Sequence, residues 1–183
     1  MVGGISYFSP RFGFVCDNVE NFEVVLASGE VVNININKHR DLWTALKGGS
    51  NNFGVVTRFD LRTFVQGKFW GGVIQYPIST APAQITAFSN FAGTRDYDIY
   101  ASLITNFAFT SAQGYGALNN IEYTKPIVNP KVFQPLTSIE PQYASTMRIS
   151  NLSDFANELT AFSPNGNRYA QCIDKFTSCV GRH

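Results

Sequence analysis

Two glycine-containing segments of this 183-residue chain have residue types suited to contacts with phosphate groups. The first is Gly3-Gly4, which precedes an aromatic turn, and the second is the run GGSNNFG at residues 48–54. Glycine lets the main chain adopt positive φ and approach a ligand closely, so that backbone N–H groups can donate to phosphate oxygens. Both segments are therefore candidate ligand-contacting loops.

The elements predicted around residues 48–54 exclude two familiar phosphate-binding motifs. A dinucleotide-binding fingerprint follows a strand and opens a helix, whereas this loop follows a predicted helix and precedes a predicted strand. A P-loop requires Gly-Lys-Ser or Gly-Lys-Thr, and neither follows the loop. The same residues also suit a helix C-cap followed by a turn, so the structural and the ligand-binding interpretations both stay open.

Alternation of apolar and polar residues predicts a β-hairpin close to the start of the chain. Residues 21–27 and 30–36 are rich in β-branched side chains and alternate as strands do. Ser28-Gly29 lies between them, which favours a tight two-residue turn.

A short helix and a third strand are predicted after the hairpin. Residues 41–47 have an apolar face, with Asp41 as the expected N-cap and Gly48 as the expected stop. Residues 55–64 alternate as a strand with one buried and one solvated face. The apolar residues expected on its buried face are Val55, Phe59 and Leu61.

The pattern changes after Gln66, where strands are interspersed with helices. This arrangement predicts an α+β fold, with an antiparallel sheet on one side and helices on the other. Residues 165–183 have no periodicity, and we expect an irregular tail there. The predicted strands are 69–76, 99–109 and 115–123, and the predicted helices are 81–91 and 154–162.

Composition excludes several classes of function. The formal net charge is +1, which removes the electrostatic argument for nucleic-acid binding. No apolar run approaches the roughly 20 residues of a membrane-spanning helix, and the first residues lack a signal-peptide pattern, which leaves the compartment open. The three cysteines have no metal-site spacing; Cys172 and Cys179 either form a disulfide or are thiols like Cys16.

Four stretches of the first sixty residues form an ordered pattern. They read GGISYFSPRFGF (3–14), CDNV (16–19), FEVVLASG (22–29) and DLWTALKGGSNNFGVVT (41–57). This pattern resembles the FAD-binding domain of FAD-linked oxidases of the vanillyl-alcohol oxidase / p-cresol methylhydroxylase (PCMH) superfamily. The nearest group is the fungal berberine-bridge-enzyme-like oxidoreductases. The resemblance is weaker from residue 65 to about residue 162.

The resemblance implies both a fold and an activity. The expected α+β fold has the second half of a PCMH-type FAD-binding domain at residues 1–66. Part of an antiparallel-sheet substrate domain, with helices on one face, follows at residues 67–164, and the tail occupies residues 165–183. The expected activity is FAD-dependent oxidation of a small-molecule alcohol, sugar or secondary-metabolite carbon by hydride transfer. The alternative is a non-catalytic remnant without a cofactor.

The resemblance also implies roles for five residues toward FAD. Gly3 and Gly4 would lie in the turn that faces the ribityl and pyrophosphate groups. Asn52 would cap the second loop, and Gly54 would let the chain approach the cofactor. The backbone of Val56 would face the adenine side. The residues that attach flavin covalently in this family do not lie within this chain.

No catalytic residue is assigned from the sequence. A tyrosine on one of the predicted substrate-domain strands is a candidate proton acceptor, but for each tyrosine taken singly, packing of the ring in the sheet is the stronger explanation. We expect the isolated chain to hold FAD weakly or not at all, to turn over no substrate and to self-associate through exposed apolar surface. The tyrosines considered are Tyr76, Tyr100, Tyr115 and Tyr123.

Overall fold

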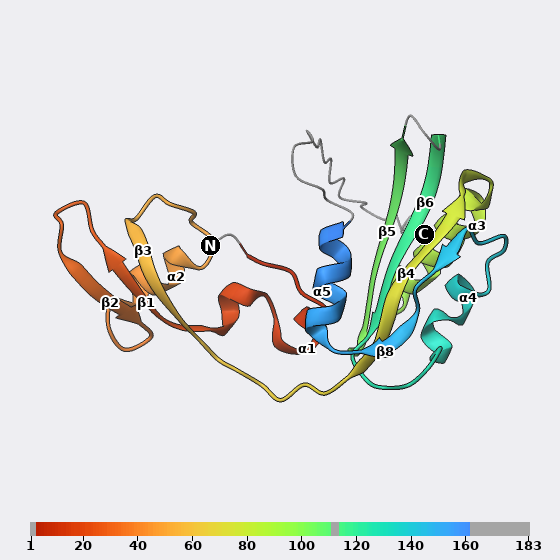
Figure 1. Cartoon of the computed structure of the whole chain (residues 1–183). Coiled ribbons are helices and arrows are strands. Elements are labelled where there is room, and N and C mark those ends of the chain that lie inside the picture. The colour runs from red at the N-terminus through yellow and green to blue at the C-terminus, as the bar shows by residue number, and fades with distance from the viewer. Residues whose placement is uncertain (1–2, 111–113, 162–183) are drawn as a thin grey trace, which may run out of the picture.

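Two antiparallel sheets lie side by side in the computed structural model, which describes residues 3–110 and 114–161 (Figure 1). The N-terminal stretch and the linker after the third strand connect them. The first sheet has three strands in the order β2-β1-β3, and the second has five. The strands of the first sheet are β1 (Val19–Val25), β2 (Val31–Asn35) and β3 (Val55–Leu61).

Helix α2 (Arg40–Leu46) packs against the first sheet and encloses a small core. Leu46 is buried there, and Leu42 and Trp43 pack against the same cluster. One apolar helix face against one sheet face is the arrangement that the sequence pattern predicts. The buried residues of this core are Val19, Phe22, Val24, Val32, Ile34 and Leu46.

The hairpin turn and the start of α2 differ in detail from the prediction. The loop has three residues, because Leu26 N–H donates to the Glu30 carbonyl at 2.9 Å and Gly29 N–H donates back to Leu26. Gly29 has φ +85°, so it supplies the left-handed residue that completes a three-residue loop. Asp41 is not the N-cap: the helix begins at Arg40, and Asp41 lies in its first turn.

The three residues predicted to be buried on β3 are not buried: Val55, Phe59 and Leu61 are 67%, 39% and 45% exposed. A β-bulge places Val55 on the face away from the core, since the register passes from Glu23↔Arg58 directly to Val24↔Val56 and leaves one extra residue on β3. Val56 packs against the core instead. Phe59 lies on the core face, where it is in register with the buried Phe22 and packs edge-on against it at 5.7 Å.

The second sheet is organised around the long strand β4 (Phe69–Pro77). β6 pairs with one edge of β4, and the two short strands β7 and β8 pair with the other edge. All these pairings are antiparallel, and β5 extends the sheet beyond β6. The remaining strands are β5 (Ala101–Thr110), β6 (Gly114–Tyr123), β7 (Ala144–Ser145) and β8 (Arg148–Ser150).

Helices α3 (Ala81–Gly93) and α4 (Gln134–Thr137) enclose the larger core with one face of this sheet. Two 3-10 turns, η2 (Ile78–Thr80) and η3 (Lys131–Phe133), lead into them. This agrees with the α+β arrangement expected from the sequence. The buried residues of this core are Trp70, Ile74, Tyr76, Ala87, Ala101, Ala117, Ile121, Tyr123, Phe133 and Leu136.

Helix α5 (Leu152–Ala161) lies on the opposite face of the second sheet. Its Phe155 packs on Phe69, whose side chain points away from the face that carries its neighbour Trp70. The N-terminal stretch joins the same cluster through Phe8. Helix α1 (Ser9–Phe12) and the 3-10 turn η1 (Val15–Asn18) then return the chain to the first sheet.

A set of polar and cation–aromatic contacts ties α1 and the linker to the second sheet. Arg11 donates to Gln66 at 2.9 Å, and Gln66 donates to the Thr124 carbonyl at 3.2 Å. The ring of Tyr100 receives both Arg11, 5.1 Å from its centroid, and Lys125, 3.5 Å from its centroid. These contacts hold the connecting segments in place.

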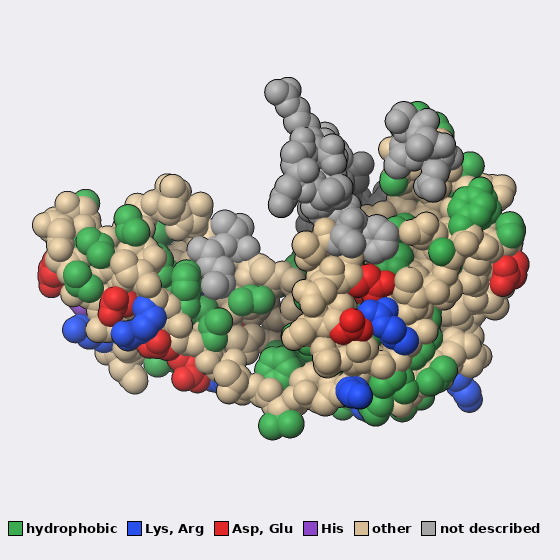
Figure 2. All heavy atoms as spheres, viewed as in Figure 1, with side chains coloured by type: hydrophobic (Ala, Val, Ile, Leu, Met, Phe, Trp, Pro, Cys, Tyr) green, Lys and Arg blue, Asp and Glu red, His purple; other side chains and the backbone are tan. Residues whose placement is uncertain are grey.

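Apolar side chains also reach the surface of both units (Figure 2). Val65 of the linker is completely exposed, and Ile5 is 83% exposed. Cys16 is buried, while Cys172, Cys179 and the predicted tail lie outside the described residues. Within the described ranges, no helix has the length and apolar character needed to cross a membrane.

Candidate functional site

The Gly3-Gly4 turn lies against η1. The Gly3 carbonyl accepts from Cys16 N–H at 2.9 Å, and the Gly4 carbonyl accepts from Val15 N–H at 2.8 Å. Both glycines have positive φ, at +57° and +91°, which other residues adopt only with strain. A Cβ on Gly4 would meet Val15 at 2.9 Å, whereas a Cβ on Gly3 would meet nothing within 4 Å.

The loop after α2 is held together by its own contacts. Gly49 N–H donates to the Ala45 carbonyl at 2.8 Å, and the Asn52 amide donates to the Gly49 carbonyl at 2.7 Å. Gly54 has φ +137°, and a Cβ there would lie 2.6 Å from the Val25 carbonyl oxygen. Gly54 therefore lets the loop pass close to β1, and Asn52 closes the turn after the helix.

Packing of the chain against itself explains four of the five residues predicted to face FAD. Gly4, Asn52, Gly54 and Val56 each have a contact within the described residues that accounts for the residue type. Gly3 differs, because its backbone has left-handed geometry and open space on the side where a Cβ would stand. This open side is what the described residues offer a cofactor at the turn, and it is compatible with close approach of a phosphate or ribityl group.

Two of the tyrosines considered as proton acceptors, Tyr76 and Tyr123, form hydrogen bonds within the second unit. The Tyr76 hydroxyl donates to the Leu136 carbonyl at 2.9 Å, and the Tyr123 hydroxyl donates to Asp98 at 2.9 Å. Burial raises the pKa of each of these two phenols to about 12. A base needs a lowered phenol pKa, so their environment opposes that role.

The other two tyrosines are also accounted for by packing. Tyr115 is 67% exposed and packs on the ring of Phe109 at 4.9 Å. Tyr100 lies between the cations of Arg11 and Lys125 described above.

Sequence reasoning missed a buried polar group on β6. Glu122 is fully buried, and its neighbour Asn120, on the same face of the strand, is 4% exposed. Burial raises the pKa of Glu122 to about 9, with the nearby carboxylate of Glu158 adding to the effect. A glutamate inside the strand sequence NNIEY is the signal that could have revealed it, because charged residues are seldom fully buried.

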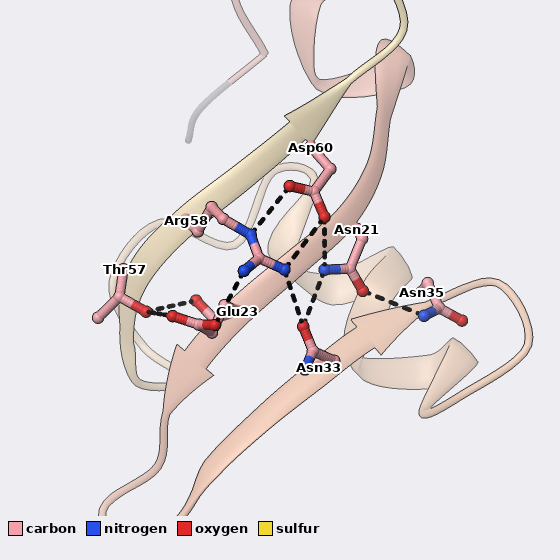
Figure 3. Close-up of polar contacts among 7 residues, drawn as sticks. All are labelled: Asn21, Glu23, Asn33, Asn35, Thr57, Arg58 and Asp60. Atoms are coloured by element: carbon pink, nitrogen blue, oxygen red, sulfur yellow. Dashed lines mark hydrogen bonds and ion pairs between the residues drawn. The ribbon is translucent and has the colours of Figure 1, made fainter.

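The face of the first sheet away from α2 carries a network of polar side chains (Figure 3). Arg58 is its centre: it contacts Asp60 at 3.0 Å and Glu23 at 3.2 Å, and it also donates to Asn33. Half of the Arg58 side chain is exposed, so water competes for these contacts. The network links all three strands, and its contacts help to fix their register. Its members are Asn21, Glu23, Asn33, Asn35, Thr57, Arg58 and Asp60.

A hollow of about 390 Å³ adjoins this network, and Asn21 and Asn35 of the network line it. Trp43, Asp17 and Arg62 contribute to its wall. None of the five residues predicted to face FAD lines it. The hollow is therefore separate from the candidate cofactor-contacting segments.

Most of the similar known proteins are FAD-dependent monooxygenases of fungi, although the chain is also 42% identical over 153 residues to the oligopeptidase PhomG' of Diaporthe leptostromiformis, covering 82% of this chain and 13% of that protein. The chain is 47% identical over 173 residues to the FAD-dependent monooxygenase elcE of Phaeosphaeria nodorum, covering 87% of this chain and 52% of that protein. It is 42% identical over 167 residues to the FAD-dependent monooxygenase CTB5 of Cercospora beticola, covering 86% of this chain and 32% of that protein. No family model matches the chain.

Solved structures agree with these relatives on the fold. The chain superposes on 6-hydroxy-D-nicotine oxidase from Arthrobacter nicotinovorans with a TM-score of 0.74 at 17% identity, covering 91% of this chain and 37% of that one. Xylooligosaccharide oxidase from Myceliophthora thermophila gives a TM-score of 0.65 at 18% identity, with 91% and 34% coverage. The chain is therefore similar in sequence to FAD-dependent monooxygenases and shares the fold of these two oxidases.

The chain covers only part of the length of these relatives. It spans about half the length of elcE and about a third of CTB5. The resemblance to fungal FAD-linked oxidases and the α+β fold are confirmed. The roles of the five individual residues toward FAD stay predictions.

Proposed function

We propose that this chain is the segment of an FAD-dependent oxidoreductase that oxidises a small alcohol, sugar or secondary-metabolite carbon. The observation that carries the proposal is the 47% identity to an FAD-dependent monooxygenase over 87% of the chain. Bound FAD would supply the redox chemistry, taking up a hydride from the substrate carbon and passing its electrons to dioxygen. The residues of the protein would bind FAD and orient the substrate against it.

Within that function, residues 1–66 belong to the FAD-binding domain and residues 67–164 to the substrate-binding domain. The open side of Gly3 would admit the ribityl or pyrophosphate group, and Gly4 would fix the turn on η1. Asn52, Gly54 and Val56 would shape the second loop, with their backbone facing the cofactor. The Asn52 hydrogen bond, the packing of Val56 and the close approach of Gly54 to β1 give this loop a defined conformation before any ligand binds.

Titration of the purified chain with FAD, followed by quenching of flavin fluorescence, tests the proposal. We expect saturable binding that is weaker than micromolar, because one segment provides only part of a cofactor site. Gly3→Ala should weaken it further, since the new methyl group would occupy the open side of the turn. Gly29→Ala is the matched control: Gly29 also has positive φ and open space, but it lies in the hairpin turn.

The second candidate function is a non-catalytic remnant that binds no cofactor. Absence of saturable FAD binding by the wild-type chain would favour it, as would equal effects of Gly3→Ala and Gly29→Ala. Submicromolar affinity, or hydrogen peroxide formed from a panel of alcohols and sugars, would show that this segment is more self-sufficient than we propose.

Self-association is part of the same proposal. Large apolar side chains are exposed on the first sheet and on the linker, and such surfaces favour association. Sedimentation velocity over a range of concentrations should show oligomers that grow with concentration. A monomer at every concentration would contradict this part of the proposal.

A further inference from the structure

Residues 151–153 form a sequence pattern that the proposed function does not use. They read Asn-Leu-Ser, which fits the acceptor pattern for attachment of a glycan to asparagine: Asn, any residue except proline, then Ser or Thr. No other asparagine of the 183 residues begins this pattern. Because so short a pattern also arises by chance, the geometry around Asn151 decides whether it can serve.

The three residues lie at the surface, between strand β8 and helix α5 (Figure 1). β8 ends at Ser150, which is paired in register with Phe69, so Asn151 is the first residue outside the sheet. Asn151, Leu152 and Ser153 are all exposed. An attached glycan is bulky and hydrophilic, so it requires a surface position of this kind.

The side chain of Asn151 uses its oxygen for the fold and not its nitrogen. Oδ1 accepts a hydrogen bond from Asp154 N–H at 2.9 Å and thereby caps α5. This bond also identifies the two amide atoms, because an amide nitrogen cannot accept. Nδ2, the atom to which a glycan is attached, donates no hydrogen bond within the part of the chain that the structure describes. The helix cap and a glycan would therefore use different atoms of one side chain.

The start of α5 is held in place by contacts on its inner side. Phe155 is buried against Phe69, with ring centroids 4.8 Å apart. Arg148 of β8 contacts the Asp154 carboxylate at 2.6 Å. Neither contact uses the side chain of Asn151, so a group attached to Nδ2 would displace neither of them.

We propose that Asn151 is an N-glycosylation site, with the glycan on Nδ2 while Oδ1 continues to cap α5. The donor is an oligosaccharide carried on a lipid diphosphate in the secretory pathway. In the transfer, Nδ2 forms a bond to the anomeric carbon of the first sugar and loses one proton to solvent. The bond from that carbon to the diphosphate oxygen breaks, and its electron pair leaves with the diphosphate, so the step needs no oxidant or reductant. The site is independent of FAD binding.

Expression of the full chain behind a cleavable secretion leader in a eukaryotic host tests the proposal. The same chain made without the leader gives the electrophoretic mobility of the unmodified protein. Most wild-type molecules should migrate as one larger species, and peptide N-glycosidase should return them to the unmodified mobility. This enzyme converts the glycan-bearing asparagine to aspartate, so a peptide map of the treated protein should show that conversion at position 151.

Two variants remove the acceptor pattern but keep the helix cap. Asn151→Asp retains a side-chain oxygen for Asp154 N–H and has no amide nitrogen, whereas Ser153→Ala retains Asn151 itself. Both should lose the glycan completely, while Ser153→Thr keeps the pattern and should carry it. Asn157→Asp is the matched control, because Asn157 is exposed on the same helix but begins no acceptor pattern. This control should be glycosylated as wild type is.

A wild-type chain without a glycan, both in the medium and in the cell extract, would overturn the proposal. A glycan that persists in Asn151→Asp or in Ser153→Ala would overturn it too, because another residue would then be the acceptor. Thermal melts test the separate use of the two amide atoms: glycosylated wild type should melt at a temperature no lower than Ser153→Ala. A clearly lower melting temperature would show that the glycan breaks the α5 cap, and would overturn the claim that the two coexist.

Discussion

The ring centroids of Phe69 and Phe155 lie 4.8 Å apart, and this contact joins the first residue of β4 to the first turn of α5. Both side chains are buried, at 0% and 2% exposure. Phe8 and Tyr7 pack against the same pair, so three segments distant in sequence share one aromatic cluster. This cluster is the place where the N-terminal stretch meets the second sheet.

Phe155→Ala should lower the free energy of unfolding by about 3–5 kcal/mol, because it empties a buried aromatic site. Urea denaturation followed by circular dichroism measures the change. Leu152→Ala is the control on the same helix; Leu152 is 44% exposed, and its loss should cost less than about 1 kcal/mol. Similar losses for the two variants would show that α5 is not anchored through Phe155.

Gly54→Ala should destabilise the first sheet more than Gly29→Ala does. Both glycines have positive φ, so each substitution costs about 1 kcal/mol or more in backbone strain. Only at Gly54 would the new Cβ also collide with β1, 2.6 Å from the Val25 carbonyl oxygen. Thermal melts of the two variants compare these costs. A Gly54→Ala protein as stable as Gly29→Ala would mean that the loop can move away from β1 freely.

Asn151→Ala should cost about 1 kcal/mol of stability, since the Asn151 side chain accepts a hydrogen bond from Asp154 N–H at 2.9 Å at the start of α5. Asn157→Ala, at an exposed position inside the same helix, should be neutral or slightly stabilising, because alanine favours helix. The difference between the free energies of unfolding of the two variants, measured by urea denaturation, gives the contribution of the Asn151 N-cap. A neutral Asn151→Ala would show that another group satisfies this N–H.

Stability should fall with rising pH through Glu122. Its folded pKa, about 9, is above the ordinary carboxyl value of 4.5, so the folded state holds a proton that the unfolded chain releases. The contribution is fully present below pH 4.5 and is lost as pH rises through about 9. The slope for one such proton is about −1.4 kcal/mol per pH unit between these limits.

Urea denaturation at several pH values from 5 to 9 measures this slope. Glu122→Gln should flatten the profile, whereas Glu30→Gln, at an exposed position, should leave it as in wild type. A wild-type profile already flat across this range would mean that Glu122 is ionised, with a partner, in the folded protein.

The elements of the fold could largely be predicted from the sequence, because alternation and helical periodicity depend on local composition. The strand at β4 and the helix at α3 were predicted within a few residues of where they lie. The position of Val55 on β3 could not be predicted, because it depends on a bulge at Thr57 that the pairing with β1 creates. Such a bulge leaves no clear mark in the sequence of one strand.

The candidate site was less accessible to sequence reasoning. The glycines were found because their residue type is unusual, but the sequence could not distinguish Gly3, whose open side is free, from Gly54, which packs on β1. Glu122 was missed because its environment comes from β4, α5 and the N-terminal stretch together. A side chain's exposure is a tertiary property, and in this chain it decides which residues are available for binding.

The position of Tyr7 and Phe8 has a consequence for cleavage of the chain. Tyr7 and Phe8 precede the first sheet, but their rings pack against Phe69 of the second sheet. A protease that cut at the fully exposed Val65 would break the covalent connection but not these aromatic contacts. The two fragments should therefore stay together as a non-covalent complex and elute as one species from a size-exclusion column. The two units would then be held together by side-chain packing as well as by the linker.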